Sequence, residues 1–238
     1  MYKNKKICCI VPARKNSSEL HKKNLKKINN IPLFLHPIFQ AKKSKFIDKI
    51  YFNSDSKFMV NLSKKIGATA NFIRSKKHST NKSKIADVLM HHFKHYDINN
   101  KFDYFILLEP TSPLTSVKDI DKAIKILINH KQATSLVSVS SKLTQNFKIE
   151  LKKNNRLLKP IKSTSLYKMR RQDLNREYFV CGTLYISEVK SFIKYKNFVQ
   201  KNTTYYEVDK IKAFEIDDFI DFQIVKQLYK FRKKFEKN

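Results

Sequence analysis

Short, wholly apolar runs alternate in the first half of the chain with longer stretches in which apolar residues recur every three or four positions. The run 7–11 (ICCIV) is too short for a helix and predicts a strand buried on both faces, as in the centre of a parallel sheet. The run 104–109 (YFILLE) has the same character. Further strands are predicted at 47–53, 68–73 and 135–139.

Helices are predicted between these strands. Pro32 suits the first position of a helix that runs to about residue 43, and the segment 54–56 should cap a helix that ends at Gly67, where a left-handed residue is wanted. A third helix is expected from 85 to about 95, and Ser116 with Asp119 forms a capping signature for a fourth. This alternation predicts an α/β protein with a doubly wound, mostly parallel sheet.

The second half of the chain has a different pattern. Short strands are predicted at 147–151 and 156–161, and 163–177 is polar without a clear period. Regular structure resumes with strands at 179–186, 205–208 and 211–216, a short helix at 188–193 and a final helix over about 219–235. We interpret the chain as a single domain, 1–238, in which 142–205 forms a small β-rich insertion suited to dimerisation.

The charge of the chain raises the possibility of an anionic partner. The 50 Lys and Arg against 20 Asp and Glu give a formal net charge of +30, which by itself favours a nucleic-acid or anionic-surface partner. The lysines are spread along the chain, however, and abundant Lys, Asn, Ile, Phe and Tyr beside 2 Gly is the pattern that A+T-rich coding produces. We therefore interpret the charge as compositional drift, with nucleic-acid binding as the alternative.

The cysteines and the apolar runs bear on the compartment. Cys8, Cys9 and Cys181 form no even disulfide framework and no C-x-x-C pair, which fits a reducing compartment. No stretch approaches the roughly 18 apolar residues of a membrane span. We expect a cytoplasmic protein.

The segment that follows the first predicted strand is polar and cationic. It carries Arg14, Lys15, Lys22 and Lys23 among Asn and Ser residues. In open α/β sheets ligands bind outside the carboxyl ends of the strands, so this loop predicts an anion site, with a polyphosphate as the expected anion. The alternative is that these are solvated charges in a lysine-rich chain.

Several short blocks resemble one enzyme family. VPAR at 11–14, NS at 16–17, KNL at 23–25, LLEPTSPL at 107–114, RRQDL at 170–174 and GTLYI at 182–186 occur in order, and EID at 215–217 follows them. Together they resemble the acylneuraminate cytidylyltransferases, which make CMP-sialic acid and related CMP-sugars. The resemblance extends over about residues 7–228 and implies a Rossmann-like nucleotidyltransferase.

This resemblance implies roles for individual residues. Arg14 and Lys23 would be catalytic, stabilising the developing charge and the leaving pyrophosphate. The residues expected at the nucleotide are Arg14, Ser17, Asn24, Arg74 and Ser83. The residues expected at the sugar are Glu109, Lys148, Arg171, Tyr185 and Phe198, although surface lysine and core phenylalanine are equally good interpretations of Lys148 and Phe198.

The resemblance also implies a metal. Glu215 and Asp217 match the two acids that hold Mg²⁺ in the family. On the predicted strand 211–216 and its extension, residues two apart face the same side, so both carboxylates could share a hard cation with substrate phosphates.

The implied activity is transfer of CMP from CTP to a nonulosonic, sialic-acid-like or Kdo-like sugar, with release of pyrophosphate, by a homodimer that serves cell-surface polysaccharide synthesis. The chain departs from the usual family pattern at several positions. Lys15 and Asn16 replace two glycines of the opening loop, and Ser18, Glu19, Thr115, Cys181 and Glu215 are further departures. Two alternatives therefore stay open, a divergent member with altered or lost activity and a basic nucleic-acid-binding protein.

Overall fold

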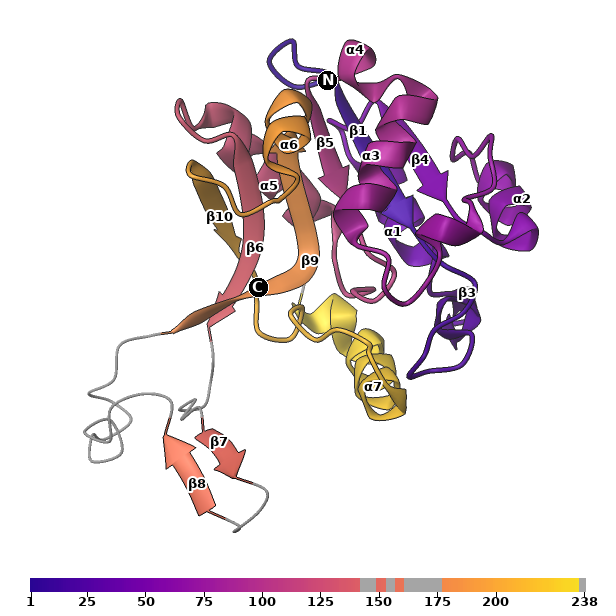
Figure 1. The fold of residues 1–238 in the computed structure, drawn as a ribbon, viewed down its shortest axis with the longest axis vertical. Helices are drawn as coiled ribbons and strands as arrows, with labels where there is room; N and C mark the ends of the chain where they lie inside the picture. The colour runs from indigo at the N-terminus through magenta and orange to yellow at the C-terminus, as the bar shows by residue number, and fades with distance from the viewer. Residues whose placement is uncertain (142–148, 153–156, 161–176, 236–238) are drawn as a thin grey trace.

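A computed structural model describes residues 1–141, 149–152, 157–160 and 177–235. Its centre is a six-stranded sheet in the order β10-β6-β9-β5-β1-β4, in which only β9 runs antiparallel to its neighbours (Figure 1). The mostly parallel α/β sheet expected from the sequence is thereby confirmed. The strands are β1 Ile7–Pro12, β4 Lys49–Asn53, β5 Tyr104–Leu107, β6 Ser135–Ser141, β9 Tyr178–Glu188 and β10 Thr203–Glu207.

Helices cover both faces of the sheet because the strands are apolar on both sides. On one face Ile7, Cys9 and Val11 pack into a core cluster with α1, α2 and α5, and on the other Cys8 and Ile10 pack with α3 and α6. This is the doubly wound arrangement. The helices are α1 Leu35–Lys43, α2 Lys57–Lys65, α3 Ile85–Tyr96, α4 Ile98–Lys101, α5 Val117–Asn129 and α6 Val189–Tyr195.

A third, smaller apolar cluster attaches the final helix, α7 Phe219–Phe235, to the loops that leave the sheet. Its buried members include Leu20, Leu33, Leu114, Ile216 and Phe222. The segments around it are the 3-10 helix η1 Lys23–Leu25 and the two-residue strands β2 Lys27–Ile28 and β3 Ile31–Pro32. This cluster therefore holds the opening loop, the loop after β5 and the chain before α7 together.

The capping signals at Gly67 and at Ser116 with Asp119 form as expected, whereas Pro32 lies in β3 and the helix expected there begins only at Leu35. Gly67 has a φ of 95°, which is the left-handed region. Ser116 and Asp119 make a reciprocal capping box at the start of α5. The hairpin of β7 Ile149–Lys152 and β8 Leu157–Pro160 overlaps the two short strands predicted there.

Two predicted strands were wrong. At 68–73 the chain makes a single parallel bridge from Thr69 to Tyr51, after which the Asn71 amide is taken by the Tyr96 hydroxyl at 2.6 Å, so no ladder continues. At 211–216 the Asp209 carboxylate accepts from the Ile211 amide at 2.9 Å and bends the chain into a turn. A further 3-10 helix, η2 Lys76–His78, follows the first of these segments.

None of the described helices combines the length and apolar character needed to cross a lipid bilayer.

Candidate functional site

The candidate site lies where β1, β4 and β5 end at one edge of the sheet. The loops after these strands are 13–25, 54–56 and 108–116, and the chain before α7 joins them through a hydrogen bond from the Ile216 amide to the Thr111 carbonyl at 2.9 Å. Ligands bind at this edge in open α/β sheets. Candidate residues far apart in the sequence thus share one edge.

The opening loop is fixed to the end of β4. The Lys15 amide donates to Asp55 Oδ1 at 2.6 Å, and the Ala13 amide donates to the Asn53 carbonyl at 2.9 Å. Asp55 therefore anchors the loop, whereas the cap of α2 is Ser56, whose hydroxyl accepts from the Met59 amide at 3.4 Å. Asp55 was expected to serve the cap, and its contact across 40 residues was not visible in the sequence.

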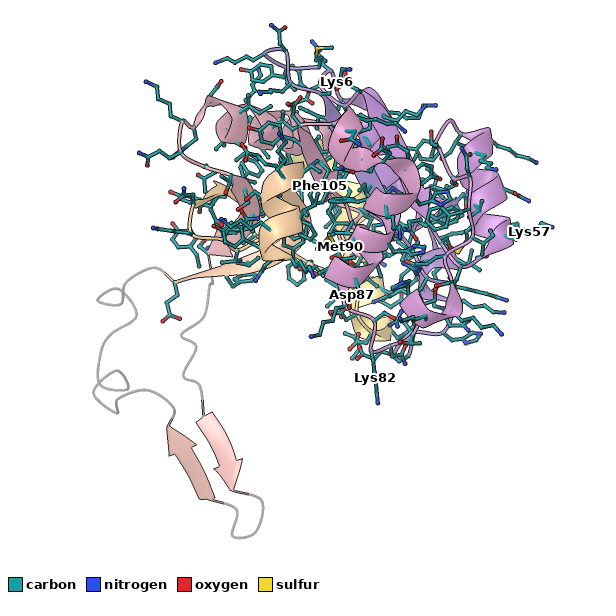
Figure 2. All side chains as sticks on the ribbon, turned by 45° about the horizontal axis from the view of Figure 1, so that its top comes forward. Lys6, Lys57, Lys82, Asp87, Met90 and Phe105 are labelled. Carbon is teal, nitrogen blue, oxygen red and sulfur yellow. The ribbon has the colours of Figure 1, made fainter. Side chains whose placement is uncertain are left out.

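Two arginines line this side of the site. Arg14 donates from Nη1 to Asn81 Oδ1 at 2.5 Å, and Arg74, only 5 % exposed, donates from Nε to Ser79 Oγ at 3.2 Å. Burial lowers the pKa of Arg74, which the Asp55 carboxylate partly opposes. Guanidinium groups are the side chains best suited to bind phosphate or carboxylate. By contrast, Lys82, in the same loop as Asn81, projects away from the body of the protein (Figure 2).

Three other predicted nucleotide or catalytic residues have defined places. Asn24 is buried and donates from Nδ2 to the Arg14 carbonyl at 2.8 Å, so its amide holds Arg14 in place. The Ser83 hydroxyl accepts from the Thr80 amide and donates to the Lys77 carbonyl, both at 3.1 Å, and so shapes its own loop. Ser17 is partly exposed in the opening loop.

Lys23 faces an acidic group on the other side of the site. Its ammonium donates to the Ile216 carbonyl at 2.7 Å and to Asp217 Oδ1 at 3.2 Å. Glu109, in the loop just after β5, has a pKa raised to about 7 by burial and by the neighbouring Glu215, against the opposing effect of Lys23. One cation and three carboxylates are thus electrostatically coupled here.

Glu215 is fixed by β9. Its Oε1 accepts from the Gly182 amide, and burial raises its pKa although this hydrogen bond acts in the opposite direction. A Cβ on residue 182 would lie 2.6 Å from Glu215 Oε2, closer than side chains approach in proteins. A side chain at Gly182, one of two glycines in the chain, would therefore force the Glu215 carboxylate to move.

Replacing Gly182 with alanine should displace the Glu215 carboxylate and lower the free energy of unfolding by about 1–3 kcal/mol, because a short charge-assisted bond is lost and a methyl group is forced into occupied space. Denaturant unfolding measures the change. The double variant Gly182→Ala, Glu215→Ala should be less than additive, since no carboxylate remains to clash. Strict additivity would contradict the assigned contact.

Tyr185 and Phe198 differ in exposure. Tyr185 on β9 is partly exposed, and burial together with Glu109 and Glu215 raises the pKa of its hydroxyl. Phe198 is 7 % exposed and packs behind it, with ring centroids 5.0 Å apart. The position of Phe198 fits the core-residue interpretation. Lys148 and Arg171, with the rest of 170–174, lie outside the described residues.

Within the part of the chain that the structure describes, no group of three or more His, Cys, Asp or Glu side chains is arranged to hold a metal ion by itself. The two predicted ligands are placed differently: Glu215 is partly buried on Gly182, and the Asp217 side chain is 67 % exposed beside Lys23. Since 211–216 does not form a strand, strand alternation does not place these two carboxylates on one side.

Comparisons with known proteins agree with this arrangement. The family model for cytidylyltransferases matches residues 8–238. The chain is 28% identical to post-translational flagellin modification protein B of Campylobacter coli over 94% of this chain and 95% of that protein, and 29% identical to CMP-N,N'-diacetyllegionaminic acid synthase of Legionella pneumophila over 94% and 96%. Its fold is similar to that of CMP:2-keto-3-deoxy-manno-octonic acid synthetase complexed with CTP, with a TM-score of 0.69, 14% identity and coverage of 94% and 98% of the two chains.

Proposed function

The chain belongs to the cytidylyltransferase family, and on this basis we propose that it transfers CMP from CTP to a nonulosonic, sialic-acid-like sugar and releases pyrophosphate. The relatives that are similar over their whole length include a synthase of a CMP-nonulosonate. The observation that carries the proposal is the site itself, in which arginines and Lys23 meet carboxylates at the carboxyl edge of the sheet. The cations suit the phosphates of a nucleotide, and the carboxylates suit the hydroxyl groups of a sugar.

In this reaction the sugar hydroxyl oxygen forms a bond to the α-phosphorus of CTP while the bond from phosphorus to the pyrophosphate oxygen breaks. Phosphoryl-transfer catalysis is mostly positioning and charge stabilisation, so a cationic site is sufficient without a protein nucleophile. Arg14 and Arg74 would hold the nucleotide phosphates. Lys23, fixed by Ile216 and Asp217, would stabilise the charge that develops on the leaving group.

Glu109 would contact a hydroxyl of the sugar. Its pKa of about 7 suits a carboxylate that accepts a proton from that hydroxyl near neutral pH. The partly exposed Tyr185, whose ionisation Glu109 suppresses, would line the same pocket. Arg171, which lies outside the described residues, is proposed for the sugar carboxylate.

The raised pKa of Glu109 makes stability depend on pH. The stabilisation of the protonated form is complete below about 4.5 and is lost as the pH rises to about 7. Glu109→Gln removes this loss, so the free energy of unfolding of the variant relative to the wild type should increase by about 1–3 kcal/mol between pH 5 and pH 8. Turnover should fall by about 100-fold at neutral pH. A difference in stability that does not change with pH would contradict the assignment.

We propose Mg²⁺ as the cofactor, held by Glu215 and Asp217. The mutual repulsion of these carboxylates, which contributes to the raised pKa of Glu215, is what a cation would relieve. Mg²⁺ usually takes one or two protein carboxylates and completes its shell with water and substrate phosphates, which fits a site with two predicted ligands. When bound, the ion would supply charge neutralisation at the phosphates.

Asp217→Asn should weaken Mg²⁺ binding in the presence of CTP by about tenfold or more, because one anionic ligand of a hard cation becomes neutral. The Asp217 side chain is 67 % exposed, so the fold should be unaffected. Thermal shift against Mg²⁺ concentration, with CTP present, provides a readout besides turnover. Glu207→Gln, which removes an exposed carboxylate from β10 at the far edge of the sheet, should leave the titration unchanged.

The function is tested by pyrophosphate release from CTP with Mg²⁺ and a panel of nonulosonic acids, with ATP, GTP and UTP as controls. Release that requires CTP and one of the acids supports the proposal and identifies the sugar. A cooperatively folded protein that releases no pyrophosphate with any acid would overturn it in favour of a non-catalytic member.

The same proposal includes a homodimer in the cytoplasm, formed by a single domain. The insertion predicted at 142–205 is too long at its C-terminal end, because β9 and α6 belong to the main sheet and its core. We therefore propose the part before β9, where the hairpin β7–β8 forms a separate two-stranded sheet, as the dimerisation segment.

A further inference from the structure

Strand β9 is irregular where it passes the carboxylates of the candidate site. It lies beside β6 in the main sheet (Figure 1), and in their ladder two successive pairs are separated by one residue on β6 but by four on β9, 181–184. The pairs are Val137 with Tyr185 and Val139 with Val180. The extra residues form a β-bulge, which interrupts the ladder, bends the strand and can turn a group toward a functional site.

The hydroxyl of Ser138, the β6 residue opposite the bulge, replaces the missing ladder partners. Its Oγ lies 2.6 Å from the Cys181 carbonyl oxygen and 2.9 Å from that of Leu184, and it accepts from the Leu184 amide at 3.1 Å. All three residues are buried, so these backbone groups are shielded from water. One side chain thus satisfies polar groups that a regular ladder would otherwise pair.

The bulge directs other polar groups of β9 toward the segment before α7. The Gly182 amide donates to Glu215 Oε1, and the Thr183 hydroxyl donates to the Lys212 carbonyl at 3.2 Å. The Thr183 carbonyl in turn accepts from the Thr115 hydroxyl at 3.1 Å. The loop after β5 and the segment that carries Glu215 are therefore both attached to the bulge.

The direction of the Gly182 amide depends on the Ser138 hydroxyl. Gly182 lies between the two residues that this hydroxyl holds, and glycine turns more easily than any other residue. Buried backbone groups that lose a partner are unfavourable, so without the hydroxyl the bulge has to rearrange to satisfy them. Such a rearrangement would carry the Gly182 amide away from Glu215.

We propose that Ser138 is a positioning residue for the candidate site, whose buried hydroxyl holds the β9 bulge in the form that presents the Gly182 amide to Glu215. The positioning follows from the contacts within the protein. Its consequence for Mg²⁺ rests on the proposed function, because groups that orient a metal ligand affect metal affinity without touching the ion.

The two glycines of the chain, Gly67 and Gly182, provide the test, since a protein labelled with ¹⁵N-glycine gives one backbone amide resonance for each. Glu215→Gln identifies the Gly182 resonance, and Gly67, in the turn after α2, is the internal reference. In Ser138→Ala the Gly182 amide proton should move upfield. It should also exchange with solvent at least about tenfold faster, because a hydrogen bond to a carboxylate is lost.

Ser140→Ala is the matched control. Ser140 lies on the same strand and is equally buried, but its hydroxyl donates outside the bulge, to the Val208 carbonyl at 3.4 Å. This variant should leave both glycine resonances unchanged. An unchanged Gly182 resonance in Ser138→Ala would overturn the proposal, and so would an equal change in Ser140→Ala.

A conservative variant covers the case in which Ser138→Ala does not fold. Ser138→Cys keeps the shape of the side chain with weaker hydrogen bonds, and it should move the Gly182 resonance in the same direction by a smaller amount. An unchanged Gly182 resonance in this variant would equally overturn the proposal.

The consequence for Mg²⁺ is measured separately, by thermal shift against Mg²⁺ concentration with CTP present. The half-saturating concentration should rise about tenfold in Ser138→Ala and stay unchanged in Ser140→Ala. If the wild type itself showed no response to CTP and Mg²⁺ while the Gly182 resonance moved as expected, the positioning role would be supported and the proposed function would be contradicted.

Discussion

Arg14→Ala should abolish measurable turnover, a loss of at least about 10²–10³-fold in kcat/KM for CTP, because a preorganised cation at the developing phosphate charge disappears. Its carbonyl remains to accept from Asn24, and only the side-chain contact to Asn81 is removed. The free energy of unfolding should therefore change by no more than about 1 kcal/mol. Steady-state kinetics and denaturant unfolding on the same preparation separate the two effects.

Lys15→Ala is the matched control. It removes the adjacent cation, but the contact of residue 15 with Asp55 is made by the backbone amide and survives the change. The Lys15 side chain is on an exposed residue, so near-normal turnover is expected. If Arg14→Ala kept wild-type activity, or if both variants lost it equally, the assignment of Arg14 to the nucleotide would be wrong.

Lys23→Gln should lower kcat/KM by about 100-fold, because the only cation hydrogen-bonded to the acidic group of the described site becomes neutral. Glutamine can still donate to the Ile216 carbonyl, so the substitution removes charge more than structure. The change also has a signature that does not depend on turnover. Since Lys23 lowers the pKa of both Glu109 and Glu215, their pKa values should rise in the variant.

The rise is measured from stability against pH. In the wild type, the stabilisation from protonated Glu109 is lost as the pH approaches about 7, and in the variant this loss should extend to higher pH. Lys22→Gln is the control, an exposed neighbour with a left-handed backbone, φ 50°. An unchanged pH profile in Lys23→Gln would mean that Lys23 does not act on these carboxylates.

The sequence predicted the sheet well where burial alone decides. The fully apolar run 7–11 could only be a central strand, and β1 indeed lies between β5 and β4. The prediction of strands failed where a single polar contact determines the local backbone conformation. Asp209 turns an apolar segment that otherwise has the pattern of a strand, and Tyr96 takes the amide that would have continued the bridge at Thr69.

The candidate site was predictable in its location and less so in its construction. Arg14 and Glu109 follow strands whose carboxyl ends meet, so their shared edge follows from topology. The contacts that aim them are long-range. Lys23 reaches a carbonyl 193 positions away, and nothing local in the sequence marks that contact. Only Gly182 indicated such a contact in the sequence, because a rare glycine inside a strand suggests that another group approaches closely.

The antiparallel strand β9 also constrains the order in which the strands of the main sheet can pair. β5 and β6 are not neighbours; each pairs with β9, which stands between them. The two halves of the sheet can therefore join only through β9, which follows β1, β4 and β5 by more than 70 residues along the chain, since β5 ends at Leu107 and β9 begins at Tyr178. Glu215 and Asp217 come later still in the chain. These two carboxylates can thus take their places only after the cationic loop and Glu109 have been made.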